Sequence, residues 1–238
     1  MEDFSGIVNW ENFFRQSENF KKNKPFKFAF VENFFENDFY EKLYKTYPSL
    51  DGFADGSDLS KSQLIRHWGK FGENVVGEED DPQFSEEWNK FKHYSQTEEF
   101  IGNFRKFSNI HVNKLKFFHF VAYKKGGFQL PHIHNVGPST LVIFFYFSKN
   151  WKKGDPGGTY MASEEDESSI IFEPYNLDNT MAIFHDGPNA VHGVRYITED
   201  VERRAQCIVL EEYSPQTGWS GGDPLKLIDD RKKNAVDL

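Results

Sequence analysis

The chain has little cysteine and no excess of positive charge. Cys207 is the only cysteine among 238 residues, so no intrachain disulfide can form, which favours a reduced, cytoplasmic protein. Acidic residues outnumber basic ones by 37 to 28, and the net charge is -9. This balance argues against a protein whose main partner is the phosphate backbone of a nucleic acid, although it is compatible with a local basic pocket for a small acid.

Long apolar runs and linkers are also missing. No stretch approaches the roughly 18 consecutive apolar residues that a membrane span needs. Met1-Glu2-Asp3-Phe4 carries acids where a secretory signal would carry Lys or Arg. We therefore expect no membrane partner. No linker rich in Pro, Gly or Ser divides the chain, so we expect one enlarged domain, whose oligomeric state the sequence does not indicate.

Aromatic residues are abundant, with 26 Phe, and in residues 1–114 many of them recur at helical spacing. Asn37-Asp38 is a candidate N-cap for a helix that ends before Pro48. A second helix is expected after Ser85, and a third after Ser95-Gln96-Thr97-Glu98, which has the form of a capping box. We expect this part to be mostly helical and irregular, as an N-terminal elaboration of the same domain.

Residues 51–83, between the expected helices, are rich in Gly and Asp. Such a segment is most simply a solvated loop. The alternative is a lid over a site, because long loops in compact domains are often functional.

From Leu115 onward the chain changes to short β-rich runs broken by turn residues. The eight expected strands are residues 115–123, 129–134, 139–147, 158–162, 169–173, 179–184, 190–197 and 204–213. Eight short strands without helical pattern between them predict a jelly roll, here over residues 115–213, followed by a tail at 214–238. With the helices packed on one face, the fold class is α+β.

Two histidines, His132 and His134, stand two residues apart in the second expected strand. Side chains alternate across a strand, so both imidazoles should project to one face, close enough to share a metal ion. His192 lies in the seventh expected strand, and the fold would have to bring it beside this pair. Neutral imidazoles suit iron, zinc, copper and nickel, so the spacing does not choose the metal, and ordinary polar packing is the alternative.

Short segments around these histidines occur in a recognisable order. In chain order they are Tyr123-Lys124-Lys125-Gly126, Tyr146-Phe147-Ser148-Lys149-Asn150-Trp151, Gly157-Gly158, Ile183-Phe184-His185-Asp186-Gly187 and Arg203. Over residues 115–213 this set resembles the prolyl 4-hydroxylase-like branch of the iron(II)- and 2-oxoglutarate-dependent oxygenases, and residues 28–35 are similar to the segment before that family's first helix. The resemblance implies a double-stranded β-helix that uses iron(II), 2-oxoglutarate and oxygen, with ascorbate as a supporting reductant.

One position departs from the family pattern. Where the family has an aspartate, this sequence has His134. The usual iron site has two histidines and one carboxylate, so a neutral imidazole in the third position would leave one more unit of positive charge at the metal. We expect His132, His134 and His192 to bind the metal. The alternatives are a His134 that acts from outside the coordination sphere, or a catalytically altered site.

A 2-oxoglutarate site needs a cation for the distal carboxylate, preferably one that offers two parallel hydrogen bonds. Arg203 and Arg204 are adjacent, so they should point to opposite faces of a strand. Every second residue after Arg203 is small or apolar, which makes Arg203 the expected inward residue; the alternative is an arginine at the surface. The family match implies that Tyr146 binds the same carboxylate and that Tyr123 lies beside the iron, but each could equally be a buried core tyrosine.

The resulting prediction is a hydroxylase that oxidises a prolyl or small-molecule substrate while 2-oxoglutarate becomes succinate and carbon dioxide. The rival is a non-catalytic, cupin-like or lectin-like jelly-roll module whose histidines bind zinc or nothing, and which has no need of an inward Arg203. His185 and Asp186 are interpreted as turn residues rather than metal ligands, and Gly157-Gly158 as a tight turn or a close contact. Residues 66–68 could face a substrate.

Overall fold

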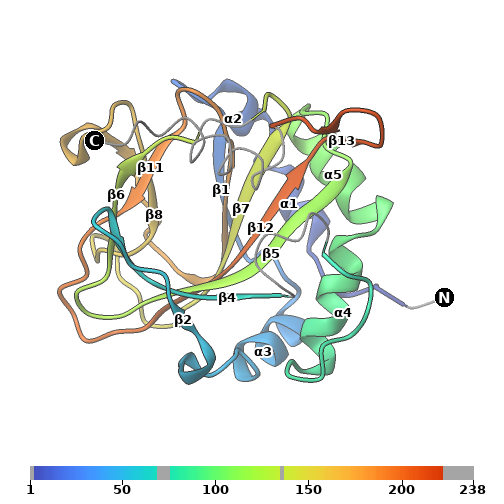
Figure 1. The fold of residues 1–238 in the computed structure, drawn as a ribbon, viewed down its shortest axis with the longest axis horizontal. Coiled ribbons are helices and arrows are strands. Elements are labelled where there is room, and N and C mark those ends of the chain that lie inside the picture. Colours follow the sequence, from blue (N-terminus) through green and yellow to red (C-terminus); the bar gives the residue numbers. More distant parts are fainter. Residues whose placement is uncertain (1–2, 69–75, 135–136, 222–238) are drawn as a thin grey trace, which may run out of the picture.

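The computed structural model describes residues 3–68, 76–134 and 137–221, and two antiparallel sheets face each other in it (Figure 1). The seven-stranded sheet has the order β1 (Phe28–Glu32), β10 (Asp178–His185), β7 (Thr140–Phe147), β12 (Arg203–Glu211), β5 (Lys114–Tyr123), β4 (Leu64–His67), β2 (Ala54–Asp55). The five-stranded sheet has the order β3 (Lys61–Ser62), β6 (Phe128–His132), β11 (Val191–Val194), β8 (Thr159–Ala162), β9 (Ile170–Phe172). The predicted jelly roll is confirmed, and β5 to β12 correspond to the eight predicted strands.

Within the described ranges, five short α-helices flank the larger sheet on the side away from the smaller one (Figure 1). They are α1 (Trp10–Phe14), α2 (Ser17–Lys22), α3 (Asn37–Lys45), α4 (Glu86–Ser95) and α5 (Glu98–Ser108). The predicted α+β class, with helices on one face of the sheet, is therefore confirmed. None of these helices, and no other helix in the described ranges, is long and apolar enough to cross a membrane.

The predicted helix starts needed two corrections. The N-cap of α3 is Glu36 rather than Asn37-Asp38, and its side chain makes no capping hydrogen bond. The N-cap of α5 is Thr97, whose hydroxyl accepts a hydrogen bond from the backbone N–H of Phe100 at 3.2 Å, whereas Ser95 is the last residue of α4. Both deviations reflect how little a short sequence pattern says about helix ends.

The larger sheet is buried on both faces, which explains the high phenylalanine content. Alternate residues of β7 face the helices, and these are Leu141, Ile143, Phe145 and Phe147. The residues between them face the interior between the two sheets, and these are Val142, Phe144 and Tyr146. One face therefore builds the core against the helices, and the other is available to line a cavity.

Four strands in the N-terminal part were not predicted. β1 pairs with β10, so that Phe28 lies opposite Phe184, and it extends the larger sheet at one edge. β4 pairs with β5 and β2 with β4 at the other edge, while β3 pairs with β6 in the smaller sheet. The expected loop 51–83 is thus partly β structure, and its residues 69–75 lie outside the described ranges. β2 and β3 have two residues each, which is too short to show a pattern of their own, and they are defined by the strands that they join.

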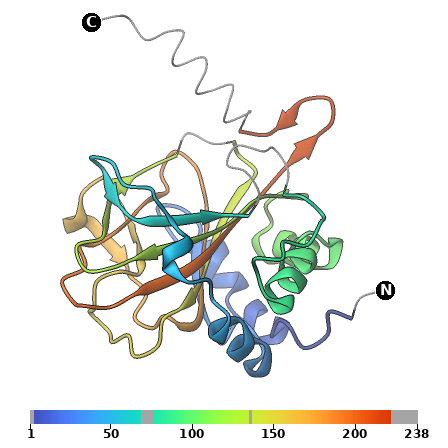
Figure 2. The ribbon, with the colours of Figure 1, turned by 60° about the horizontal axis from the view of Figure 1, so that its bottom comes forward.

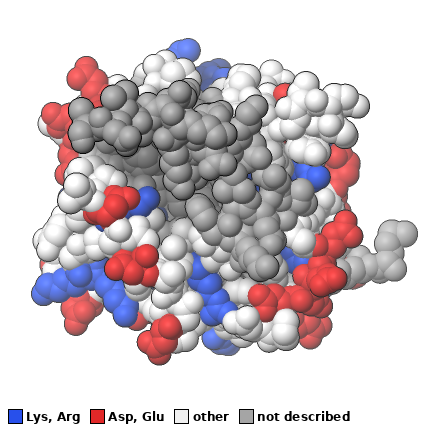
Figure 3. All heavy atoms as spheres, in the orientation of Figure 1, with Lys and Arg blue, Asp and Glu red and all other residues white. Residues whose placement is uncertain are grey.

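The C-terminal part that the structure describes ends in a small hairpin of β13 (Tyr213–Ser214) and β14 (Gly218–Trp219). Figure 2 shows this hairpin projecting beyond the end of β12. On the face drawn in Figure 3, the Lys and Arg side chains of the described residues are interspersed with Asp and Glu.

Candidate active site

A cavity of about 560 Å³ lies between the two sheets. The larger sheet contributes alternate residues of β4, β5, β7 and β12, and the smaller sheet contributes β3, β6, β8 and β11. Apolar side chains form much of the wall, among them Val121, Val142, Phe144 and Val209. The volume lies within the usual range for a site that takes a small ligand or a substrate side chain.

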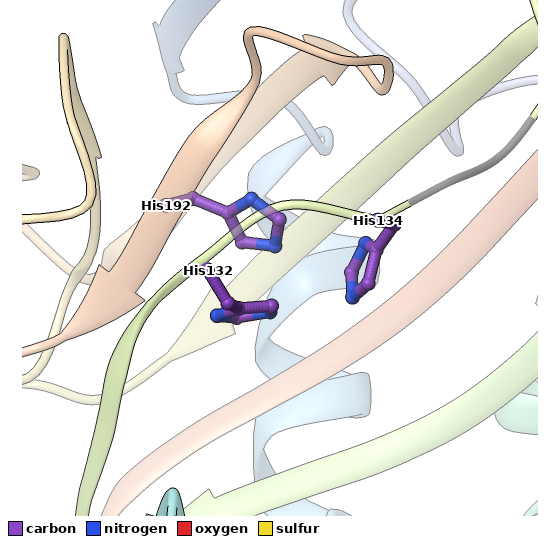
Figure 4. A group of neighbouring side chains, drawn as sticks. All are labelled: His132, His134 and His192. Carbon is purple, nitrogen blue, oxygen red and sulfur yellow. The ribbon is translucent and has the colours of Figure 1, made fainter.

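Three histidines meet at this cavity (Figure 4). His132 ends β6 and lies opposite His192 of β11 in the strand register, with their ring centroids 4.3 Å apart. The ring of His134 lies 4.8 Å from that of His132 and 4.9 Å from that of His192. One nitrogen from each ring can be chosen so that all three lie within 4.8 Å of one another, as a shared metal ion requires.

His134 joins this group although the strand prediction for it was wrong. β6 ends at His132, so His134 belongs to the segment after the strand, and strand alternation is not what orients it. Its Nδ1 lies 2.8 Å from Oδ2 of Asp186, a carboxylate that directly follows β10. This contact turns the other ring nitrogen of His134 toward the remaining two histidines.

The other two histidines are held in the same way. Nδ1 of His132 lies 2.9 Å from the carbonyl oxygen of Leu130, and Nδ1 of His192 lies 2.8 Å from that of Ala190. A carbonyl oxygen can only accept, so each Nδ1 carries the proton and donates it. The lone pair of each ring is therefore on Nε2, which is the arrangement that metal-binding histidines commonly have.

Burial favours the neutral form of His132 and His192. Desolvation lowers the pKa of His132, and it lowers the pKa of the fully enclosed His192 well below the ordinary value, with the neighbouring histidines adding to that effect. A metal ion binds the unprotonated imidazole, so this environment favours metal binding over protonation.

Arg203 is a buried cation beside the cavity. It is 0% exposed, and its guanidinium carbon lies 5.0 Å from the ring centroids of Tyr123 and Tyr146. Its Nε donates to the carbonyl oxygen of Gly157 at 2.8 Å and its Nη2 to Oγ1 of Thr159 at 2.7 Å. Its Nη1 is buried and has no hydrogen-bond partner among the described residues, nor does Arg203 form an ion pair there.

An unpaired, buried guanidinium is costly unless an anion compensates it. Thr159 and Tyr123, which contact Arg203, also line the cavity. The unpaired Nη1 is therefore chemically suited to an anionic partner such as a carboxylate. Arg204, on the opposite face, pairs with Glu202 at 2.5 Å.

The two predicted tyrosines lie on either side of this arginine. The hydroxyl of Tyr146 accepts a hydrogen bond from the backbone N–H of Thr159 at 3.2 Å, which leaves its own proton for a ligand. The hydroxyl of Tyr123 lies 2.9 Å from Oε1 of Gln63 and 3.1 Å from Oε1 of Gln129. Nε2 of Gln129 in turn lies 3.3 Å from Nε2 of His132, so Tyr123 reaches the histidine group through a glutamine.

Gly157 permits the contact that orients Arg203. Its φ of +124° lies in a region that residues with a side chain rarely adopt, and a Cβ there would lie 2.7 Å from the ring of Trp151. Gly158 is equally confined, because a Cβ would lie 2.9 Å from Pro174. Of the two interpretations of this pair, a tight turn or a close contact, the close contact is observed at both glycines.

The end of the cavity farthest from Arg203 along β12 contains charged side chains that are already paired. Lys116 and Glu211 line it and form a buried ion pair with each other at 2.6 Å. His67 and His119 lie opposite each other on β4 and β5, and burial, with His67 second, lowers the pKa of His119 to about 3. Of residues 66–68, only His67 lines the cavity, whereas Trp68 is buried against Phe84.

No protein-family model matches the chain, and no curated protein matches its sequence. Solved structures do match its fold. A prolyl-4-hydroxylase from Pseudomonas putida matches with a TM-score of 0.60 at 11% identity, covering 85% of this chain and 100% of that chain. A Trichoplax adhaerens prolyl hydroxylase, in complex with a peptide fragment of hypoxia inducible factor, matches with a TM-score of 0.55 at 15% identity, covering 84% and 88%. HygX from Streptomyces hygroscopicus, with nickel and 2-oxoglutarate bound, matches with a TM-score of 0.53 at 10% identity, covering 84% and 85%.

The fold is that of the 2-oxoglutarate oxygenases. At these identities the likeness establishes the fold, and the roles of individual residues depend on the geometry described above.

Sequence reasoning missed three polar residues of this site. Asp186 was interpreted as a turn residue, and Gln63 and Gln129 were not considered. Gln129 lies on the expected second strand three residues before His132, and this proximity was the one available signal. Asp186 is 52 residues from His134, and only the folded chain brings them together.

Proposed function

We propose that this protein is a non-haem iron(II)- and 2-oxoglutarate-dependent oxygenase of the hydroxylase type. The observation that carries the proposal is that three clustered imidazoles line one cavity of a fold shared with known oxygenases, and that a buried arginine with an unpaired Nη1 contacts two residues that line the same cavity, Tyr123 and Thr159. Iron and 2-oxoglutarate would supply the oxidative chemistry, in which oxygen is activated as the cosubstrate becomes succinate and carbon dioxide.

The chain's own residues would bind and orient the reactants. His132, His134 and His192 would hold the iron through Nε2, with each Nδ1 fixed by an acceptor oxygen. Arg203 and Tyr146 would hold the distal carboxylate of 2-oxoglutarate. The apolar wall of the cavity would exclude water from the reacting atoms, which strengthens these polar contacts.

The substrate would occupy the end of the cavity that His67 and His119 line. Because Lys116 is already paired with Glu211 and His119 is neutral, the described lining there offers a mostly uncharged surface. A prolyl side chain or an uncharged small molecule fits such a surface better than a second acid. One structural neighbour is in complex with a peptide, so a peptidyl substrate is one candidate.

Purified protein supplied with iron(II), ascorbate and 2-oxoglutarate is expected to form succinate slowly even without its substrate, because these oxygenases can oxidise the cosubstrate alone. Succinate formation is measured by mass spectrometry against a reaction without iron. Complete absence of succinate, together with no 2-oxoglutarate binding in calorimetry, would favour the jelly-roll binding module over the oxygenase.

A further inference from the structure

Asp186 is a buried carboxylate whose position the proposed reaction leaves unexplained. It is 1% exposed, and its Oδ2 lies 2.8 Å from Nδ1 of His134. Its Oδ1 accepts a hydrogen bond from the backbone N–H of Gly187 at 3.1 Å, and its own N–H donates to the carbonyl oxygen of Thr140 at 3.1 Å. The carboxylate is therefore held in a fixed position behind the ring of His134.

No lysine or arginine compensates the charge of this carboxylate. Within the described ranges, its only ion-pair partner is His134. A buried carboxylate is stable only when hydrogen bonds or an opposite charge compensate it. A divalent metal on Nε2 of His134 would supply that charge, because it polarises the ring and makes the N–H at Nδ1 a stronger donor toward Asp186.

The contact between Asp186 and His134 affects the net charge of the metal site. A divalent ion bound by two imidazoles and one carboxylate keeps one positive charge, whereas three imidazoles leave it with two. The histidine group contains no carboxylate among the described residues. Asp186 would return the site to one positive charge from one hydrogen bond further away.

We propose that Asp186 supplies, through His134, the negative charge that a carboxylate ligand supplies in sites with two histidines and one carboxylate. It is a positioning residue, because it acts on the metal through an imidazole and does not touch the metal itself. This inference rests on the proposed function only in that the three histidines bind a divalent metal.

The test measures nickel(II) affinity by titration calorimetry, because nickel binds imidazole and does not activate oxygen. Asp186→Asn keeps the shape of the side chain and removes its charge. We expect it to weaken nickel binding about 10- to 100-fold, as is typical when the hydrogen-bond partner of a metal-bound histidine is lost. The matched control is Asp178→Asn, which removes a carboxylate paired with Tyr40 at the other end of β10, and its affinity should equal that of the unmodified chain.

A second background tests whether Asp186 acts through His134. In His134→Asp the ligand itself carries the negative charge and Asp186 has no imidazole to act on. Adding Asp186→Asn to that variant should change nickel affinity less than about threefold, since the two residues are coupled. An undiminished loss in the double variant would contradict the proposal, because Asp186 would then act independently of His134.

A measurement on the unmodified chain decides the matter if Asp186→Asn does not fold. Cobalt(II)-loaded protein should show three shifted, solvent-exchangeable proton signals, one from each Nδ1–H. The His134 signal, identified as the one that disappears in His134→Asp, should persist because Asp186 accepts that proton. Absence of the His134 signal, or equal nickel affinity in a folded Asp186→Asn, would overturn the inference alone. Failure of the unmodified chain to bind nickel would contradict the metal site and the proposed function as well.

Discussion

Replacing Arg203 with alanine is expected to weaken 2-oxoglutarate binding by about 2 to 5 kcal/mol, the usual cost of removing one partner from a desolvated charge pair. The size of the effect follows from the site: the guanidinium is 0% exposed, is fixed by Gly157 and Thr159, and keeps Nη1 free for a carboxylate. The measurement is calorimetric titration of 2-oxoglutarate into nickel-loaded protein.

The neighbouring arginine is the matched control. Arg204 is one residue away but points to the other face, where it pairs with Glu202, so Arg204→Ala should leave 2-oxoglutarate affinity nearly unchanged. Arg203→Met tests whether any loss reflects unfolding, because an apolar side chain of similar length should preserve the packing between Tyr123 and Tyr146. A larger effect from Arg204 than from Arg203 would show that the cosubstrate does not bind in this cavity as proposed.

Replacing either His192 or His134 with alanine is expected to weaken metal binding by about 3 kcal/mol or more. This figure is roughly one ligand's share of the about 10–16 kcal/mol that four ligands provide at structural zinc sites. Metal content by mass spectrometry and nickel affinity by calorimetry measure the effect. His119→Gln is the control, since it changes a histidine that lines the same cavity but lies outside the group of three.

His134 is the informative member of this pair. If His134→Ala kept full metal content and normal affinity, His134 would not be a ligand, and the site would consist of two histidines with water in the third position. His134→Asp should restore only part of the metal affinity that His134→Ala loses, because aspartate is shorter than histidine and metal-ligand distances tolerate only about ±0.2 Å.

The strands of the jelly roll could be predicted because each buries at least one face, and an apolar run bounded by turn residues is a local signal. β7 and β12 are clear examples, since their residues are mostly buried on both sides. The inward orientation of Arg203 followed from the same alternation. By contrast, β2 and β3 have two residues each and exist only because the edges of β4 and β6 accept them, which no local pattern reveals.

The histidine group was predictable only in part. The spacing of His132 and His134 suggested a shared metal, but the strand argument holds only for His132, because β6 ends there. The orientation of His134 comes instead from Asp186, a contact across 52 residues that depends on how β10 and β6 are placed by their sheets. Residue spacing along the chain does not predict such a contact, so the role of Asp186 could be found only in the folded structure.

Binding of iron(II) and 2-oxoglutarate in one cavity should be visible in the absorption spectrum of the protein. Iron(II) is added to the purified protein without oxygen, and 2-oxoglutarate is then titrated in. We expect a weak charge-transfer band that grows with 2-oxoglutarate, saturates at one equivalent per chain, and is absent from Arg203→Ala at the same concentrations. A spectrum that 2-oxoglutarate leaves unchanged, although the protein is loaded with iron, would contradict the proposed function.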